Sequence, residues 1–199
     1  MLEIDQLELE RDNRLLRYHF SVAAGQILAI QGRSGVGKSS LLSAIAGFVT
    51  PCSGTIHWHG QALHPLSVEQ RPVSLLFQDH NLFEHLSVLD NLVLGFGGPP
   101  PLEAIHQAAC ELEVSHQLHK KPAQLSGGQR QRIGLIRTLL RPEALILLDE
   151  PFAELDSETR ELATTWVRNT AKNTGKTLLL VTHQQEDVER VADQTLNLL

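Results

Sequence analysis

The residues with the clearest chemical potential form a glycine-rich stretch in the first quarter of the chain. It reads Gly32-Arg33-Ser34-Gly35-Val36-Gly37-Lys38-Ser39 and is followed by Ser40. Glycines at this spacing let successive backbone N–H groups surround one anion without Cβ clashes. An adjacent lysine and serine supply an ammonium group and a hydroxyl, which suit a polyphosphate and its Mg²⁺ ion. These residues predict a phosphate-binding loop.

The context of this loop favours the same interpretation. The continuous apolar run Ile27-Leu28-Ala29-Ile30 before it is typical of a strand buried on both faces. Apolar residues within 41–45 recur at helical spacing, and a helix N-terminus attracts an anion. We expect Lys38 to contact the β- and γ-phosphates and Ser39 to bind Mg²⁺. The alternative is a chance glycine turn that ends in an exposed lysine. A chain of this length would match the whole motif by accident about once in a hundred.

A second candidate element is a pair of carboxylates at the end of another apolar run. Leu145-Ile146-Leu147-Leu148 leads directly into Asp149 and Glu150. Open α/β sheets bind ligands at the carboxyl ends of their strands, so we expect this pair beside the phosphate-binding loop. Asp149 can support Mg²⁺, whereas Glu150 can orient and deprotonate a water molecule. A solvated turn is the alternative for the pair on its own.

These candidate residues require an α/β framework, and the patterning of the chain predicts one. Strand and helix patterns alternate, so we expect a mainly parallel core sheet. Segments 2–9 and 18–22 alternate between apolar and polar residues, which predicts two antiparallel strands. Further strands are predicted over 55–59, 73–77, 144–148, 177–182 and 195–199, and helices over 86–94, 101–114, 127–140, 157–172 and 184–191.

The composition excludes several classes of protein. Lys and Arg total 17 against 23 Asp and Glu, a net charge of −6, so we expect no nucleic-acid partner. The apolar runs are shorter than the roughly 20 residues that cross a bilayer. The amino-terminal segment lacks a signal-peptide pattern, so export is not expected. The widely separated Cys52 and Cys110 predict neither a disulfide nor a thiolate zinc site.

Further motifs give the sequence a family resemblance. Leu125-Ser126-Gly127-Gly128-Gln129 matches the signature of the nucleotide-binding subunits of ATP-binding cassette (ABC) transporters. In family order, Gln78 matches the Q-loop, 153–156 resembles the D-loop and His183 matches the switch histidine. The sequence is similar to this family over almost its whole length. The resemblance implies a P-loop NTPase fold with an antiparallel β subdomain and an inserted α-helical subdomain.

The resemblance also implies the cofactors, the site residues and the domain organisation. The expected cofactors are ATP and Mg²⁺. The expected catalytic residues are Glu150, His183 and Gln78, and the expected magnesium ligands are Ser39, Gln78 and Asp149. Nucleotide binding is expected from residues 32–40 together with Ser126, Gly127, Gly128 and Gln129. A single domain is expected over 1–199, with the core and β subdomain in 1–78 and 141–199 and the helical subdomain in about 79–140.

The signature motif itself predicts a partner. Ser126 and the N–H groups of Gly127 and Gly128 begin a helix and form an anion site directed away from the chain's own phosphate-binding loop. In the family, two subunits dock head to tail, and each ATP lies between the P-loop of one subunit and the signature of the other. The resemblance therefore implies a homodimer that closes on ATP.

A second resemblance concerns the transport system. Arg71-Pro72-Val73-Ser74-Leu75-Leu76-Phe77-Gln78 and the residues around Phe83 and Leu86 are similar to the ATPase subunit of thiamine importers. This implies a motor that moves a transmembrane permease and acts only indirectly with an extracytoplasmic solute-binding protein. Its expected location is peripheral, at the cytoplasmic face of the inner (plasma) membrane. Phe83 and Leu86 are candidate permease anchors or, equally, core residues of the helical subdomain.

Several alternatives remain open at this point. They are an ABC importer ATPase for another small solute, a soluble ABC ATPase acting in repair or translation, and a P-loop kinase acting on a small molecule. A metal site at His57 and His59 is conceivable, although the spacing is not that of a firm ligand set. The family's adenine-stacking aromatic residue is missing from 9–12, so Arg11 is the candidate to stack on the base.

Overall fold

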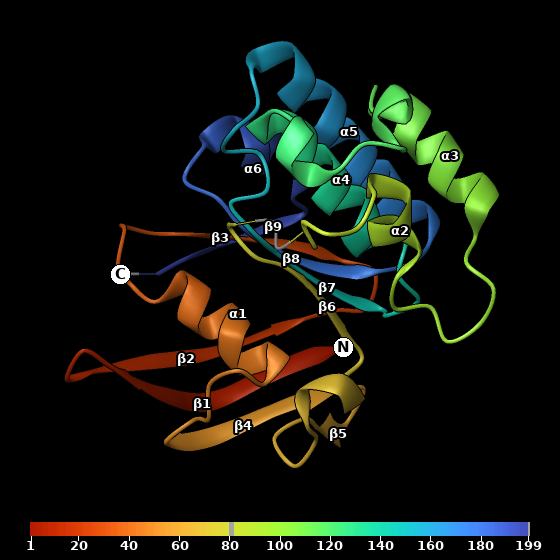
Figure 1. Ribbon diagram of the computed structural model, residues 1–199. Helices are drawn as coiled ribbons and strands as arrows, with labels where there is room; N and C mark the ends of the chain where they lie inside the picture. The colour runs from red at the N-terminus through yellow and green to blue at the C-terminus, as the bar shows by residue number, and fades with distance from the viewer. Residues whose placement is uncertain (80–81, 199) are drawn as a thin grey trace.

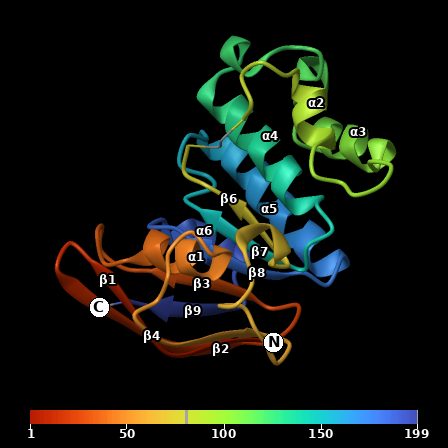
Figure 2. The same cartoon turned by 60° about the horizontal axis from the view of Figure 1, so that its bottom comes forward.

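The computed structural model describes residues 1–79 and 82–198, which form two β-sheets and the helices around them (Figure 1). One sheet has the strand order β2-β1-β4-β5 and is antiparallel. The other has the order β6-β7-β8-β3-β9 and is parallel. Helix α1 (Lys38–Ala46) lies between the two sheets, and its buried residues share one apolar core with both (Figures 1 and 2).

The antiparallel sheet follows the predicted alternation of apolar residues. Its strands are β1 (Leu2–Arg11), β2 (Arg14–Val22), β4 (Ser53–Trp58) and β5 (Gln61–Ala62). Leu2, Ile4, Leu7 and Leu9 of β1 all point into the core. Ile4 and Leu7 are an odd number of positions apart, so strict alternation would place them on opposite faces of the strand. The pairing of β1 with β2 shifts register between these two residues. This irregularity keeps both halves of β1 facing the same core.

The parallel sheet carries the strand ends beside which a ligand can bind. Its strands are β3 (Ile27–Gln31), β6 (Val73–Leu76), β7 (Leu145–Asp149), β8 (Thr177–Val181) and β9 (Gln194–Asn197). β7 and β8 are buried along their whole length because both faces of the sheet are covered. Ile146 and Leu148 contact the helical side, whereas Leu145 and Leu147 contact the side of α1.

The remaining helices cover the face of the parallel sheet opposite α1. They are α2 (Val88–Val93), α3 (Leu102–Glu111), α4 (Gly127–Leu139), α5 (Ser157–Asn173) and α6 (Gln185–Val191), with short 3-10 turns at Val68–Gln70, Ser115–Gln117 and Pro122–Gln124. α2 and α3 pack on α4, and α4 packs on α5. In Figure 2, α2 and α3 lie beyond α4, farther from the sheet.

The predicted α/β framework with a parallel core sheet is confirmed, and each predicted strand and helix has a counterpart. The helix predicted over 101–114 is shorter, because Pro101 is its N-cap, Leu112 its C-cap, and Glu113 has φ 55°. The sequence pattern missed β5 and the 3-10 turns, since segments this short show no periodicity. Leu199, the predicted end of the last strand, lies outside the described residues.

Cys52 and Cys110 are exposed free thiols. None of the helices in the described ranges combines the length and the hydropathy that a membrane span requires.

Candidate functional site

The loop between β3 and α1 has the geometry that its glycines predicted. Gly37 is the N-cap of α1 and has φ 106°. A Cβ atom at Gly37 would overlap the Tyr18 hydroxyl and the Leu16 side chain, so only glycine fits there. The Tyr18 hydroxyl donates a hydrogen bond to the Gly37 carbonyl oxygen at 3.0 Å. Strand β2 therefore holds the turn by which the loop enters the helix.

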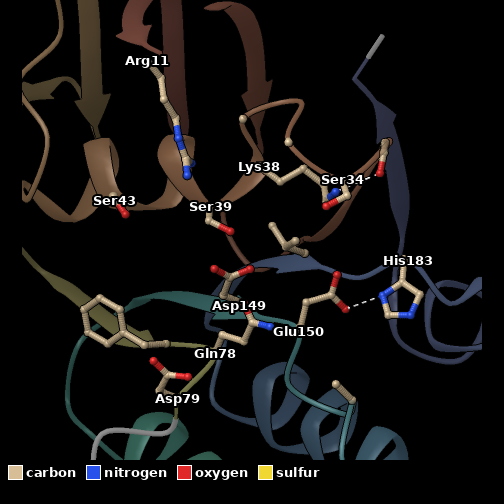
Figure 3. A pocket seen from close by; sticks show the side chains of 16 residues that line it. Arg11, Ser34, Lys38, Ser39, Ser43, Gln78, Asp79, Asp149, Glu150 and His183 are labelled. Atoms are coloured by element: carbon tan, nitrogen blue, oxygen red, sulfur yellow. Dashed lines mark hydrogen bonds and ion pairs between the residues drawn. The ribbon is translucent and has the colours of Figure 1, made fainter.

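The loop opens onto a cavity of about 800 Å³ (Figure 3). Its lining combines the loop and the first turns of α1 with residues at or just after the ends of β1, β6, β7 and β8: Arg11, Gly32, Ser34, Gly35, Gly37, Lys38, Ser39, Ser43, Phe77, Gln78, Asp79, Asp149, Glu150, Ala153, Val181 and His183. The structure thus brings the predicted loop, the predicted carboxylates and the predicted glutamine and histidine around one cavity. Arg33, Val36 and Ser40 lie in the same segment, outside this lining.

Lys38 is buried at the start of α1, with its ammonium group folded back onto the loop. Its Nζ donates hydrogen bonds to the carbonyl oxygens of Gly32 at 2.8 Å and Arg33 at 3.1 Å. The cation therefore lies where the loop N–H groups and the helix N-terminus also favour negative charge. An entering polyphosphate would meet all three contributions together.

Asp149, at the end of β7, is almost completely buried beside the loop. Burial raises the pKa of Asp149, opposed by the Ser39 hydroxyl and the Lys38 ammonium and assisted by the charge of Glu150. Its Oδ1 atom is buried and has no hydrogen-bond partner among residues 1–79 and 82–198. A buried carboxylate oxygen without a partner is costly, and a divalent cation would satisfy it. Ser39 and Asp149 together offer the hard oxygen ligands that Mg²⁺ prefers.

Glu150 directly follows β7 and adopts a left-handed backbone conformation, with φ 48°. Its N–H donates to the carbonyl oxygen of Val181 in the neighbouring strand β8 at 2.9 Å. Its Oε2 atom lies 2.9 Å from Nδ1 of His183, two residues beyond the end of β8 (Figure 3). The other ring nitrogen of His183 contacts Gln184 Nε2 at 3.1 Å. Adjacent parallel strands thus pair a carboxylate with an imidazole at the cavity.

Some residues that line the cavity were not predicted from the sequence, and one was noted for a different role. Ser43 lies one helical turn after Ser39, and this spacing was a usable signal. Asp79 directly follows Gln78, and nothing in the pattern distinguished it. Arg11, noted for its possible stacking, reaches the cavity from the end of β1 (Figure 3). Its Nη1 donates a hydrogen bond to Ser40 Oγ at 2.8 Å, which fixes the guanidinium group beside α1.

The signature residues lie apart from this cavity, at the amino end of α4. Ser126 is the N-cap, and its Oγ accepts from the Gln129 N–H at 3.3 Å. Gln129 Oε1 in turn accepts from the Ser126 N–H at 3.0 Å. This reciprocal cap leaves the N–H groups of Gly127 and Gly128 at the helix start. The predicted nucleotide-binding residues therefore divide into two separate surfaces.

The alternative metal site at His57 and His59 gains no support. Across the described ranges, no group of three or more His, Cys, Asp or Glu side chains is arranged to hold a metal ion.

Comparisons with known proteins agree with this geometry. A family model described as ABC transporter matches residues 15–153. The thiamine import ATP-binding protein ThiQ of Vibrio cholerae is 41% identical over 199 residues, covering 98% of this chain and 84% of the relative. ThiQ of Cereibacter sphaeroides is 43% identical over 201 residues, covering 98% of this chain and 87% of the relative.

A solved structure has the same fold as this chain. It is the dimeric ATP-binding cassette MJ0796 in a post-hydrolysis state, bound to ADP and Pi. It superimposes with a TM-score of 0.87 at 25% identity, covering 100% of this chain and 94% of that one. The P-loop NTPase fold that the family resemblance implied is thereby confirmed. The chain belongs to the ABC transporter family, as an ATP-hydrolysing cassette.

Proposed function

We propose that this cassette is the motor subunit of an importer whose cargo is thiamine. The relatives reported above carry the name of thiamine import ATP-binding proteins. The observation that carries the motor assignment is the division of the site into two surfaces. The cavity holds the phosphate loop and Glu150, whereas the Ser126 end of α4 is an anion site without a phosphate of its own.

In the proposed nucleotide complex, the phosphates of ATP lie on the loop of residues 32–40. Lys38 exchanges its carbonyl partners for β- and γ-phosphate oxygens. Ser39, Gln78 and Asp149 would hold Mg²⁺, and the unpartnered Asp149 Oδ1 fits this role. When bound, Mg²⁺ supplies charge neutralisation to the β- and γ-phosphate oxygens.

Glu150 is the proposed general base. Its carboxylate orients a water molecule toward the γ-phosphorus and accepts a proton from it. The bond from His183 Nδ1 restrains that carboxylate, and more than half of the His183 side chain remains exposed. Gln78 lines the same cavity from the end of β6 and is proposed to contribute to positioning the metal and the water.

The proposed partner for the signature surface is a second copy of the chain. In a head-to-tail dimer, Ser126, Gly127, Gly128 and Gln129 of one copy close on the γ-phosphate held by the other. ATP then stabilises the closed dimer, and hydrolysis removes the contacts that favour it. The dimeric state of the MJ0796 cassette supports this arrangement.

A second cavity, of about 350 Å³, is the proposed permease site. Phe48, Val68, Phe83 and Leu94 line it and are each more than a third exposed. Exposed apolar side chains gathered in one groove are typical of a protein interface. Phe83 is therefore proposed as a permease anchor, whereas Leu86 is half-buried and outside this lining.

This permease contact gives the proposed location and organisation. The chain lies peripherally at the cytoplasmic face of the inner membrane, and the solute-binding protein acts on it only through the permease. The helical subdomain of about 79–140 carries both Phe83 and the signature residue Ser126, so it connects the permease groove with the nucleotide of the second copy.

The test is reconstitution of the chain with its permease in vesicles, followed by measurement of labelled thiamine uptake and ATP turnover. Uptake is expected only with ATP inside the compartment that holds the chain. Ser126→Arg is expected to abolish uptake and turnover, while Ser21→Arg on the exposed face of β2 leaves both intact. Full turnover by a strict monomer, or by the Ser126→Arg variant, contradicts the dimer.

This experiment and two further measurements separate the alternatives. Uptake of a different solute by the same complex identifies another importer. Absence of any permease on co-purification supports a soluble ABC ATPase, and ATP consumption that yields a phosphorylated acceptor supports a kinase.

A further inference from the structure

Gln131 of α4 holds both ends of the loop that carries the proposed base. The residue is 1% exposed. Its Nε2 donates a hydrogen bond to the carbonyl oxygen of Glu150 at 3.1 Å. Its Oε1 accepts a hydrogen bond from the N–H of Glu154 at 2.9 Å. One buried amide thus binds the first and the last residue of the segment 150–154.

The first of these bonds acts on a backbone that needs restraint. Glu150 is a non-glycine residue in the left-handed region, a conformation that persists only where the surroundings fix it. On one side, its N–H is held by the Val181 carbonyl oxygen of β8. On the other, its carbonyl oxygen accepts from Gln131. The direction of the Glu150 carboxylate therefore depends on a side chain of helix α4.

That helix is the one that begins with the signature motif. Gln131 lies between one and two helical turns after the N-cap Ser126, in the same rigid element. The far end of the loop also meets the start of this helix: a Cβ atom on Gly127 would overlap the Glu154 carboxylate. The loop and the helix therefore contact each other at two places along α4.

We infer that Gln131 is a positioning residue for ATP hydrolysis, which sets the backbone of Glu150 from the signature helix. This inference rests on the proposed function, because it takes Glu150 as the base and Ser126 as the contact to the partner's nucleotide. In the head-to-tail dimer, Ser126 of one copy touches ATP held by the other, whereas Glu150 acts on ATP held by its own copy. Gln131 joins these two places within one chain, so it couples closure at one nucleotide to the geometry at the other.

The competing interpretation is that Gln131 only stabilises the fold as a satisfied buried amide. Under that interpretation, its loss lowers stability and leaves catalysis by the folded protein unchanged. The two interpretations therefore differ in kcat at a temperature where the variant is folded.

The test uses Gln131→Met, which keeps side-chain length and removes both hydrogen bonds. The matched control is Gln117→Met, because Gln117 is also a buried amide and its Oε1 has no partner within the described residues. We expect Gln131→Met to lower kcat about 10- to 100-fold, the effect of a misplacement of about 1 Å. The KM for ATP is expected to stay within about threefold, since the phosphate-binding loop is untouched. Gln117→Met should retain the parental kcat.

A second apolar variant serves if Gln131→Met does not fold. Gln131→Leu also removes both hydrogen bonds and places no charge in a site that is 1% exposed. It is expected to show the same loss of kcat when measured below its unfolding midpoint. Parental kcat in Gln131→Leu overturns the inference, because the bonds to Glu150 and Glu154 would then carry no function.

A double-mutant cycle with Glu150→Gln shows whether Gln131 acts through Glu150. Single-turnover rates are compared in both backgrounds, and we expect Gln131→Met to have less than about a twofold effect once Glu150 is replaced. An equal loss in both backgrounds overturns the inference while leaving the proposed function intact. Full hydrolysis by Glu150→Gln alone would instead contradict the proposed function.

Discussion

The Nδ1 atom of His183 lies 2.9 Å from Oε2 of Glu150, although the two residues are 33 positions apart. The contact arises because β7 and β8 are adjacent parallel strands, with Asp149 paired to Val181. Both strands end at the same edge of the sheet, so the residues that follow them meet there. The carboxylate is largely shielded, with 17% of its side chain exposed, against 58% for His183. The histidine is therefore the exposed member of the pair.

Replacement of the proposed base tests the chemistry of this pair. Glu150→Gln keeps the shape of the side chain and removes the proton acceptor, so kcat for ATP should fall by about 10²- to 10⁴-fold. ATP binding should persist, and the variant should accumulate as a closed dimer with ATP on size-exclusion chromatography. Glu158→Gln, an exposed change in the first turn of α5, is the charge-matched control and should behave as the parent. Undiminished turnover in Glu150→Gln rejects the assignment.

Replacement of His183 tests whether the imidazole restrains the carboxylate. His183→Ala leaves Glu150 without its 2.9 Å partner, and we expect kcat to fall about 10- to 100-fold, the effect of a misplaced catalytic group. The KM for ATP should change little, because Lys38 and the loop are unaffected. His106→Ala, on an exposed position of α3, is the control. Equal steady-state kinetics for the two variants would show that His183 has no catalytic role.

Tyr18 gives the fold a predicted sensitivity to alkaline pH. Burial raises the pKa of Tyr18 to about 12, partly opposed by the charge of Arg11. An unfolded tyrosine titrates near 10, so between about pH 10 and 12 the unfolded chain has lost a proton that the folded chain keeps. The unfolded state binds fewer protons in this window, so the free energy of unfolding falls as the pH rises through it.

The Tyr18→Phe variant removes this titration, so the stabilities of the parent and the variant are compared over a range of pH. Urea unfolding of both proteins should show the variant less stable by about 1 kcal/mol at pH 8, because its bond to the Gly37 carbonyl oxygen is lost. The gap should close as the pH rises above about 10. Tyr18 is the single tyrosine of the chain, so its phenolate absorbance reports the titration directly. A constant difference from pH 8 to 11.5 would contradict the prediction.

Arg11 is expected to stabilise bound ATP and GTP to a similar extent, so it does not distinguish adenine from guanine. Its guanidinium group donates to Ser40 Oγ and lines the cavity proposed for the nucleotide. A guanidinium plane stacks on any base, whereas discrimination requires hydrogen bonds to the base edge. Arg11→Ala should therefore raise the KM values for ATP and GTP by a similar factor, about 2- to 5-fold. Arg14→Ala, in the exposed start of β2, is the control. A change confined to one nucleotide would show that Arg11 reads the base.

The sequence by itself determined the parts of this protein that depend on neighbouring residues. Helices and strands follow from periodicity, and the loop from Gly32 to Ser39 follows from the conformational freedom of glycine beside a lysine and a serine. The same local reasoning predicted that the signature helix starts at Ser126. These features need no knowledge of which strands lie side by side.

Tertiary structure alone decided the contacts that give those parts their geometry. The bond between Glu150 and His183, the two bonds of Gln131 and the contact of Arg11 with Ser40 join residues that are distant in sequence. The bond between Glu150 and His183 depends on the adjacent strands β7 and β8 in the order β6-β7-β8-β3-β9. The bonds of Gln131 depend on the packing of α4 against the parallel sheet, and the Arg11 contact depends on the packing of α1 against the antiparallel sheet. A shift of one residue in a strand turns every side chain to the opposite face, so such contacts are fixed only when the whole sheet and its covering helices assemble together.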